Sequence, residues 1–442
     1  MRGISNSLKT VLGIPSSDGA RQTDRQEATE SFLSSVAIQG LLLITGILAA
    51  RMLGEDGRGE QALIWIVALT AVQIGMLGLP LALTYEVAKG QLTTKQLLNH
   101  FTSIAAAQIG LVVLAYTTVM VLAFSDRVPV SAALVTIAAL PAMIWQAYGL
   151  ALIQGRHHFR ALHVLRIMPS ALYAVGLGVS AVFSDGSVFL VMATWTGAYV
   201  ITAAITQFYI HQIGRVEVDK EHQLPGRRAL VRFGAAGFLG ASSPMETFRV
   251  DQLAVGVILT TGDLALYTTA LAFCNLPRFL TQSLGLVAYA RLAATTPSAN
   301  RQRMLIRYTL LGVAMAVVVS IPLALFTEPL IELTFGPDFT GAVLTTQILL
   351  GATIILCARR MLSDCLRGVG LPSAGSVSEV ASLVSLVPAI IVLVPTLGLE
   401  GFSLAMVISY AIGLVVLLAY LSRHRQSESE NVDQDQSVNT SY

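Results

Sequence analysis

Charged residues are scarce in this chain, and that scarcity excludes an ordinary soluble fold. They make up 12% of the 442 residues, whereas a soluble globular domain carries about 25%. Hydrophobic residues make up 54%, and the mean hydropathy is +0.68. The composition therefore indicates an integral membrane protein. With a net charge of only +2, the placement of the charges says more than their sum.

Cysteines are few, and metal-binding and nucleotide-binding motifs are absent. All three cysteines (Cys274, Cys357 and Cys365) fall within or beside apolar segments, which argues against a disulfide framework. His157 and His158 are adjacent, so they cannot chelate one metal from a helix, and no Cys/His spacing resembles a zinc site. A Walker-type phosphate loop is also missing, so ATP does not drive the protein directly. We expect no metal, no cofactor and no nucleic-acid partner.

Alternation of apolar and polar residues is absent too, which argues against an outer-membrane barrel. Apolar windows of about 20 residues, the length that crosses a ~30 Å bilayer core, are present instead. They cover residues 31–50, 61–85, 96–125, 128–155, 167–184, 186–214, 233–261, 264–290, 308–327, 339–358, 380–399 and 401–421. The sequence predicts an all-α integral membrane protein with about twelve transmembrane helices.

The basic residues give an orientation. The N-terminal arm, the even-numbered loops and the C-terminal tail hold 21 of the 28 lysines and arginines. The odd-numbered loops hold Arg51, Arg58 and Arg127, and the other four basic residues lie inside predicted spans. By the positive-inside rule both termini are cytoplasmic. We expect a multi-pass protein of the cytoplasmic membrane of a bacterium or archaeon.

The two halves of the chain look like repeats of one another. Gly59 and Ala265, which follow the first and seventh spans, are 206 residues apart, and Gly155 and Gly368, after the fourth and tenth, are 213 apart. Six helices per half predict two parallel lobes with the same orientation. We expect a cytoplasmic arm (1–30), an N-lobe (31–210), a cytoplasmic inter-lobe loop (211–228), a C-lobe (229–421) and a disordered tail (422–442).

Four arginines lie inside otherwise apolar stretches, all in the second half: Arg249, Arg278, Arg359 and Arg360. An arginine at the bilayer centre costs about 2.5–3.5 kcal/mol on insertion scales, so such residues face protein, water or an anion. Guanidinium is well suited to bidentate phosphate recognition. The four arginines are therefore candidate ligands of an anionic substrate. Arg278 is the best single candidate because no acid lies near it in the sequence.

Nearby acids offer a second interpretation of these arginines. Glu246 and Arg249 have the i, i+3 spacing of a helix salt bridge, and Arg360 and Asp364 have i, i+4 spacing. Asp251 is either a proton or cation site or a charge partner for Arg278 on the next span, and we favour the partner. Substrate binding and internal pairing stay open at each of these positions.

The first half supplies neutral polar groups in its spans. Gln39, Gln73, Gln146 and Tyr148, with three tryptophans, would line a sugar path by hydrogen bonding and ring stacking. Hydrogen bonding between helices is the commoner role of such groups in membranes.

Five short runs in order resemble a known family: LAARMLG…GRG (48–59), MLGLPLAL (76–83), RVDQLAVG (249–256), FGPDF (335–339) and LRGVGLP (366–372). They are similar to the polysaccharide-biosynthesis flippases, the O-antigen and lipid-linked oligosaccharide translocases of the multidrug/oligosaccharidyl-lipid/polysaccharide (MOP) exporter superfamily. The resemblance covers residues 31–421. It implies two six-helix lobes forming a V, alternating access and a polyprenyl-diphosphate-linked oligosaccharide as substrate. It also implies membrane lipids, a polysaccharide polymerase and glycosyltransferases as partners.

Two rivals stay beside this interpretation. The drug/cation antiporters of the same superfamily share the fold, but a cationic substrate would favour an acidic cavity rather than arginines. A glycan polymerase or ligase would need a sizeable external loop, and the longest here, 327–339, has about a dozen residues. We therefore expect a transporter rather than an enzyme.

Overall fold

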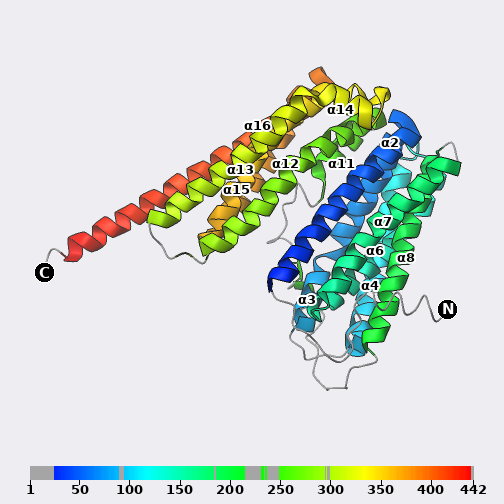
Figure 1. The fold of residues 1–442 in the computed structure, drawn as a ribbon, viewed down its shortest axis with the longest axis horizontal. Coiled ribbons are helices and arrows are strands. Elements are labelled where there is room, and N and C mark those ends of the chain that lie inside the picture. Colours follow the sequence, from blue (N-terminus) through cyan, green and yellow to red (C-terminus); the bar gives the residue numbers. More distant parts are fainter. Residues whose placement is uncertain are drawn as a thin grey trace. The chain divides into compact units, whose positions relative to one another are not determined.

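The computed structural model describes residues 24–88, 94–183, 186–214, 230–232, 234–235, 248–293, 295 and 299–439, and this part of the chain contains helices and turns but no strand (Figure 1). The helices are α2 (Asp24–Met76), α3 (Leu79–Ala88), α4 (Thr94–Ala123), α5 (Val130–Thr136), α6 (Ala139–Gly155), α7 (Phe159–Phe183), α8 (Val188–Gly214), α11 (Val250–Ile258), α12 (Thr261–Ala293), α13 (Ala299–Leu325), α14 (Thr327–Thr334), the 3₁₀ helix Pro337–Phe339, α15 (Ala342–Gly368) and α16 (Pro372–Asn439).

The chain forms two compact units, Met1–Leu253 and Ala254–Tyr442. In the first, α2 packs on α7, and α6 packs on α8 and α3. In the second, α15 is central and packs on α12, α13 and α16. The predicted inter-lobe loop, 211–228, lies outside the described residues from 215 onward, so the predicted lobe limits stay a prediction.

Within the described residues, eight helices are long and apolar enough to cross a membrane. Two of them, Leu33–Met76 with 44 residues and Ser373–Ser422 with 50, are long enough to cross twice. Each contains one non-helical glycine, Gly54 (φ 66°) or Gly398 (φ 55°), where the chain turns back. Glycine suits both turns because it has no Cβ to clash at positive φ. The predicted all-α membrane fold is confirmed.

The described helices cover eleven of the twelve predicted spans. The eighth is α12, which has 33 residues but is not among the eight most apolar helices, since Asn275 and Arg278 lower its hydropathy. The seventh, 233–261, is described continuously only from Phe248 onward.

Equivalent glycine contacts in the two units support the duplication. A Cβ on Gly155 would lie 2.8 Å from the Thr84 carbonyl oxygen and 2.6 Å from Val87 Cβ. A Cβ on Gly368 would lie 2.8 Å from the Tyr289 carbonyl oxygen and 3.0 Å from Leu292 Cβ. Thr84 and Tyr289 are 205 residues apart, as are Val87 and Leu292, and the glycines are 213 apart. Both units therefore use the same close helix crossing.

The turn after this crossing also repeats. His157 has φ 59° and Gly370 has φ 96°, and the two are again 213 residues apart. The left-handed conformation costs an L-residue roughly 1–2 kcal/mol, and glycine avoids that cost. The first unit keeps a strained histidine where the second has a glycine.

The end of the chain differs from the expectation. The backbone of α16 continues to Asn439 and so includes most of the tail, 422–442, that composition predicted to be disordered. Nucleation is the costly step of helix formation, and an existing helix extends at one hydrogen bond per residue. A polar segment that directly follows a membrane helix is therefore helical here.

Candidate functional site

Arg249 lies in a turn that is held against α2. Phe248 and Arg249 precede α11, and the Phe248 carbonyl accepts a hydrogen bond of 3.1 Å from Thr70 Oγ1 of α2. The guanidinium carbon of Arg249 lies 4.6 Å from the ring centroid of Trp65, also on α2. Such cation–π contacts are worth about 0.5–2 kcal/mol, with the larger value where water is excluded. The first unit therefore holds this arginine over an indole ring.

Other polar and aromatic groups surround this pair. Arg249 interacts electrostatically with Asp251 and with Tyr199 of α8, and its Nη1 lies 3.5 Å from Gln252 Oε1. Tyr199 makes an edge contact with Trp195, their ring centroids being 5.0 Å apart. We call Trp65, Trp195, Tyr199 and Arg249 the arginine–aromatic cluster.

Arg249 has a backbone conformation that the sequence did not predict. The i, i+3 argument for Glu246 and Arg249 assumed a continuous helix, but Arg249 has φ 48° and lies before the first turn of α11. A non-glycine residue with positive φ at such a place is strained, and strain of this kind gathers at functional sites. Glu246 lies outside the described residues, so its pairing stays a prediction.

A second polar group extends the cluster along α2. Arg58 donates to Gln61 Oε1, and Gln61 Nε2 donates to the Tyr173 hydroxyl of α7 at 3.3 Å. Arg58, Gln61 and Trp65 are spaced i, i+3 and i, i+7, so they share one face of α2. The sequence suggested that Arg58 was a loop charge, whereas the structure places it partly buried in the bundle.

Arg278 lies on α12 directly after buried Pro277, in the second unit, and is half-buried. It interacts electrostatically with Cys274, one turn earlier. The Pro277 carbonyl accepts bonds from Thr281 Oγ1 at 2.9 Å and from Cys357 Sγ at 3.7 Å. The predicted partnership of Arg278 with Asp251 joins the two units and stays a prediction.

Arg359 is built into a buried network of the second unit. Its Nη2 lies 2.6 Å from Glu379 Oε2, its Nη1 donates to Ser382 Oγ at 3.0 Å, and its guanidinium carbon lies 5.6 Å from the ring centroid of Tyr410. Side-chain exposure is 7% for Arg359 and 11% for Glu379. These contacts join α15 to both halves of α16, which favours the internal-pairing interpretation at this position.

Asp364, the acid predicted to pair with Arg360, forms an ion pair with Arg367. Asp364 Oδ1 lies 3.1 Å from Arg367 Nη2, at i, i+3, and Arg367 also lies over the ring of Tyr289 at 5.9 Å. Arg360 is half-buried. The predicted role of Arg360 stays open. Arg367, whose position suggested only a charge that sets the membrane orientation, also contacts Asp364 and Tyr289.

The neutral polar candidates separate into two kinds. Gln146 and Tyr148 are buried and tie helices together: Gln146 Nε2 donates to the Leu165 carbonyl at 3.2 Å, and the Tyr148 hydroxyl bonds Gln108 Oε1 at 2.6 Å. Gln73 is half-buried and Gln39 is exposed. Interhelical bonding accounts for the first two, and a sugar path would have to use the others.

Several of these contacts could not be anticipated. Tyr199, Glu379, Ser382 and Tyr410 were not predicted, because their partners lie on other helices and no local spacing marks them. A charged Glu379 inside an apolar segment was the one usable signal. Within the described ranges, no group of three or more His, Cys, Asp or Glu could hold a metal.

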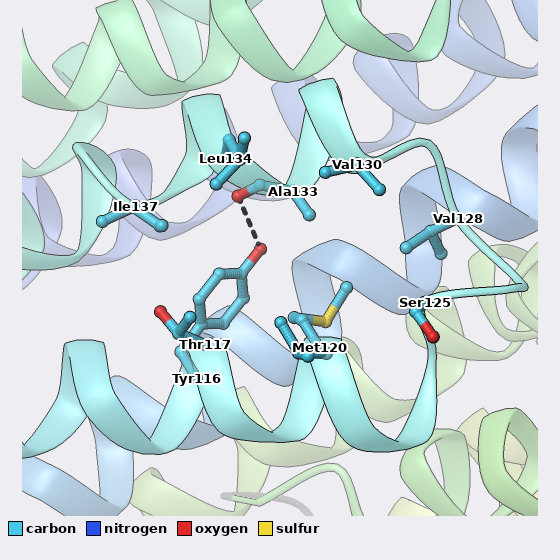
Figure 2. A pocket seen from close by; sticks show the side chains of 10 residues that line it. Tyr116, Thr117, Met120, Ser125, Val128, Val130, Ala133, Leu134 and Ile137 are labelled. Atoms are coloured by element: carbon cyan, nitrogen blue, oxygen red, sulfur yellow. Dashed lines mark hydrogen bonds between the residues drawn. The ribbon is translucent and has the colours of Figure 1, made fainter.

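A separate pocket lies between α4 and α5 in the first unit (Figure 2). Its lining is largely apolar and includes Met120, Val128, Val130 and Leu134. The Tyr116 hydroxyl bonds the Ala133 carbonyl across it at 3.2 Å. No charged side chain lines this pocket, so it does not suit an anion.

Comparisons with known proteins place this geometry in a family. The family model described as polysaccharide biosynthesis protein matches residues 26–294, more than half of the chain. The chain belongs to the polysaccharide biosynthesis protein family. No curated protein matches the chain.

Solved structures show the fold of this polysaccharide biosynthesis protein. The lipid II flippase MurJ in an inward closed conformation has a TM-score of 0.69 at 15% identity, with 88% of this chain and 87% of MurJ covered. An inward-facing multidrug resistance MATE transporter has a TM-score of 0.64 at 16% identity, with coverages of 89% and 96%. A MOP superfamily transporter from Pyrococcus furiosus, whose binding pocket is described as reversed in polarity, has a TM-score of 0.57 at 16% identity, with coverages of 91% and 96%. The protein has the MOP transporter fold.

Proposed function

We propose that this protein moves a polyprenyl-diphosphate-linked oligosaccharide from the inner to the outer leaflet of the cytoplasmic membrane by alternating access. Membership of the polysaccharide biosynthesis protein family and the MOP fold support a flippase or transporter. The substrate class goes beyond them and rests on the chemistry of the site. The transported lipid would be supplied by glycosyltransferases and consumed by a polymerase on the other side.

The observation that carries the proposal is the arginine–aromatic cluster. Arg249 supplies a guanidinium that suits a diphosphate, and Trp65, Trp195 and Tyr199 supply ring faces and edges that suit sugars. Both kinds of group lie within one unit and within contact of one another. A substrate that joins a diphosphate to a sugar matches this combination.

The acids support an anionic rather than a cationic substrate. Asp251 interacts with Arg249, and Glu379 is ion-paired with Arg359. Each of these buried carboxylates has an arginine beside it, so neither offers a bare negative charge to a cationic drug. Arg278 of the second unit is a further candidate ligand and is tested separately.

The test is glycan export in a strain that lacks the endogenous gene and carries either the wild type or a variant. Arg249→Ala and Arg278→Ala should each abolish surface glycan, because the diphosphate loses its guanidinium, while membrane levels of the protein stay normal. Trp65→Leu should reduce export, and Trp65→Phe should keep part of it, because a phenyl ring retains the cation–π contact.

The matched control is Arg127→Ala, which removes an exposed arginine from the α4–α5 connection and should leave export unchanged. Lipid-linked oligosaccharide should accumulate on the cytoplasmic side in the Arg249 variant. Normal export by Arg249→Ala and Arg278→Ala would overturn the proposal. Wild-type resistance to cationic dyes, lost in the same variants, would assign the protein to drug export instead.

A further inference from the structure

One end of the second unit carries a group of arginines that the proposed transport function does not use. They are Arg291 near the end of α12, Arg301, Arg303 and Arg307 on the first turns of α13, and Arg367 at the end of α15. Figure 1 shows these helix ends at the same end of the unit. We call these five residues the arginine collar.

Three of the arginines fasten the helix ends to one another. Arg291 Nη1 donates to the Tyr308 hydroxyl at 3.1 Å and joins α12 to α13. Arg301 Nη2 donates to the Gly368 carbonyl at 3.3 Å and joins α13 to α15. Arg367 lies over Tyr289 and joins α15 to α12. The collar is therefore a built feature of the fold, and its aromatic partners are typical of a membrane–water interface.

The collar has almost no acidic counterpart. The sequence contains no Asp or Glu between Asp263 and Glu328, and α15 contains only Asp364. This segment also contains arginine alone, since the last lysine of the chain is Lys220. A planar guanidinium bonds phosphate in a bidentate way that an ammonium group does not. The collar therefore presents an excess of phosphate-binding charge.

The α13 surface places two of these arginines beside lipid. Arg303 and Arg307 are exposed and begin a stripe along α13 that continues through exposed Leu311, Val318 and Leu325. Apart from the two arginines, the exposed members of this stripe are apolar, as a lipid-facing surface requires. From Arg307 to Leu325 the helix rises about 27 Å at 1.5 Å per residue. That span is close to the ~30 Å hydrocarbon core of a bilayer, so Arg303 and Arg307 fall at one headgroup layer.

We propose that the arginine collar binds the phosphate of an anionic phospholipid from the leaflet at this end, which the charge bias makes the cytoplasmic one. Arg303 and Arg307 take the headgroup, while Arg291, Arg301 and Arg367 hold the three helix ends that present it. The acyl chains lie along the apolar stripe of α13. This site is distinct from the arginine–aromatic cluster and does not depend on the identity of the transported lipid.

The test uses full-length protein in nanodiscs of phosphatidylcholine alone or with phosphatidylglycerol, with lipids retained after delipidation counted by native mass spectrometry. Wild type should retain phosphatidylglycerol selectively and melt at higher temperature in its presence. Arg303→Gln/Arg307→Gln should weaken that retention about 30-fold, since a basic residue near an anionic surface is worth about fivefold. Arg303→Lys/Arg307→Lys should retain an intermediate amount, because charge remains but the bidentate geometry is lost.

Arg127→Gln, an exposed arginine of the first unit, is the matched control and should behave as wild type. Equal retention of both lipids by wild type, or unchanged selectivity in the double glutamine variant, would overturn the proposal. The proposal would also be overturned if the lysine variant retained as much phosphatidylglycerol as wild type and inorganic phosphate raised the melting temperature as much as phosphatidylglycerol does. The ligand would then be a free anion. Lipid retention is measured without transport, so it tests this site separately from the transport site. Glycan export by the double glutamine variant is measured beside it, so that failure of one proposal can be distinguished from failure of the other.

Discussion

Arg359 of the second unit occupies the position of Gln146 in the first, 213 residues earlier, and replaces a neutral interhelical hydrogen bond with a buried ion pair to Glu379. Gln146 bonds the carbonyl of Leu165, whose equivalent is Ser378, next to Glu379. The same helix–helix contact is therefore made by an amide in one unit and by opposite charges in the other.

Breaking this ion pair from one side should be costly. Glu379→Gln leaves the Arg359 charge buried without its carboxylate, a change that destabilises proteins by about 3–5 kcal/mol. The double variant Arg359→Gln/Glu379→Gln should regain most of the loss, because it recreates the neutral pairing of the first unit. Thermal unfolding in detergent measures both.

Glycan export by the double variant then decides the role of Arg359. If the arginine only ties helices together, export should recover together with the melting temperature. Restored stability without export would show instead that Arg359 contacts the substrate, as the sequence alone suggested.

The repeated glycine crossing should be equally intolerant in both units. Gly155→Ala and Gly368→Ala each place a Cβ 2.8 Å from a backbone oxygen, and overpacking of this kind costs about 1–3 kcal/mol. Gly110→Ala is the control, because nothing lies within 4 Å of its added Cβ. Melting temperatures should fall for the first two variants only. A similar fall in Gly110→Ala would mean that loss of glycine itself, not crowding, is responsible.

The left-handed turn predicts opposite effects at equivalent positions. His157→Gly should stabilise the protein by roughly 1 kcal/mol and Gly370→Ala should destabilise it by about 1–2 kcal/mol, both through the backbone conformation. Gly370 has open space around it, so contacts do not complicate that variant. Unchanged stability of both variants in thermal unfolding would contradict the argument.

His158 should make stability depend on pH. Burial, Arg156 and His157 lower the pKa of His158 below its ordinary value of 6.5, and its Nδ1 lies 2.9 Å from the Tyr209 hydroxyl. The unfolded chain therefore takes up this proton at higher pH than the folded one. The contribution of neutral His158 to folding stability is fully present above pH 6.5 and is lost as the pH falls from 6.5 toward the folded pKa.

The measurement is the melting temperature at pH 7.5 and at pH 5.5. Wild type should lose stability between the two, and His158→Gln should lose less because the titrating group is gone. His211→Gln, which removes an exposed histidine from the last turn of α8, serves as the control. An identical pH dependence in wild type and His158→Gln would contradict the assignment.

Local sequence was enough for the fold because hydrophobicity and chain breaks are local properties. Apolar windows of sufficient length predicted the membrane helices. The turn at Gly54 falls between two of these windows, and the turn at Gly398 falls at the end of the window 380–399. The offset between Gly155 and Gly368 predicted the duplication, which the shared contacts of these glycines then supported. The span through Arg249 and the tail 422–442 were less well predicted. The turn at Arg249 and the extension of α16 into the tail both depend on neighbouring structure.

The amino-acid sequence by itself determined that this is a helical membrane protein of duplicated design with arginines inside its spans. Only the tertiary structure decided which groups Arg249 and Arg359 contact, because a guanidinium meets groups that lie far away along the chain. Arg249 meets Trp65, 184 residues earlier, and Arg359 meets Glu379 on another helix. Side chains of the same type therefore became a candidate substrate ligand in one place and a buried ion pair in the other.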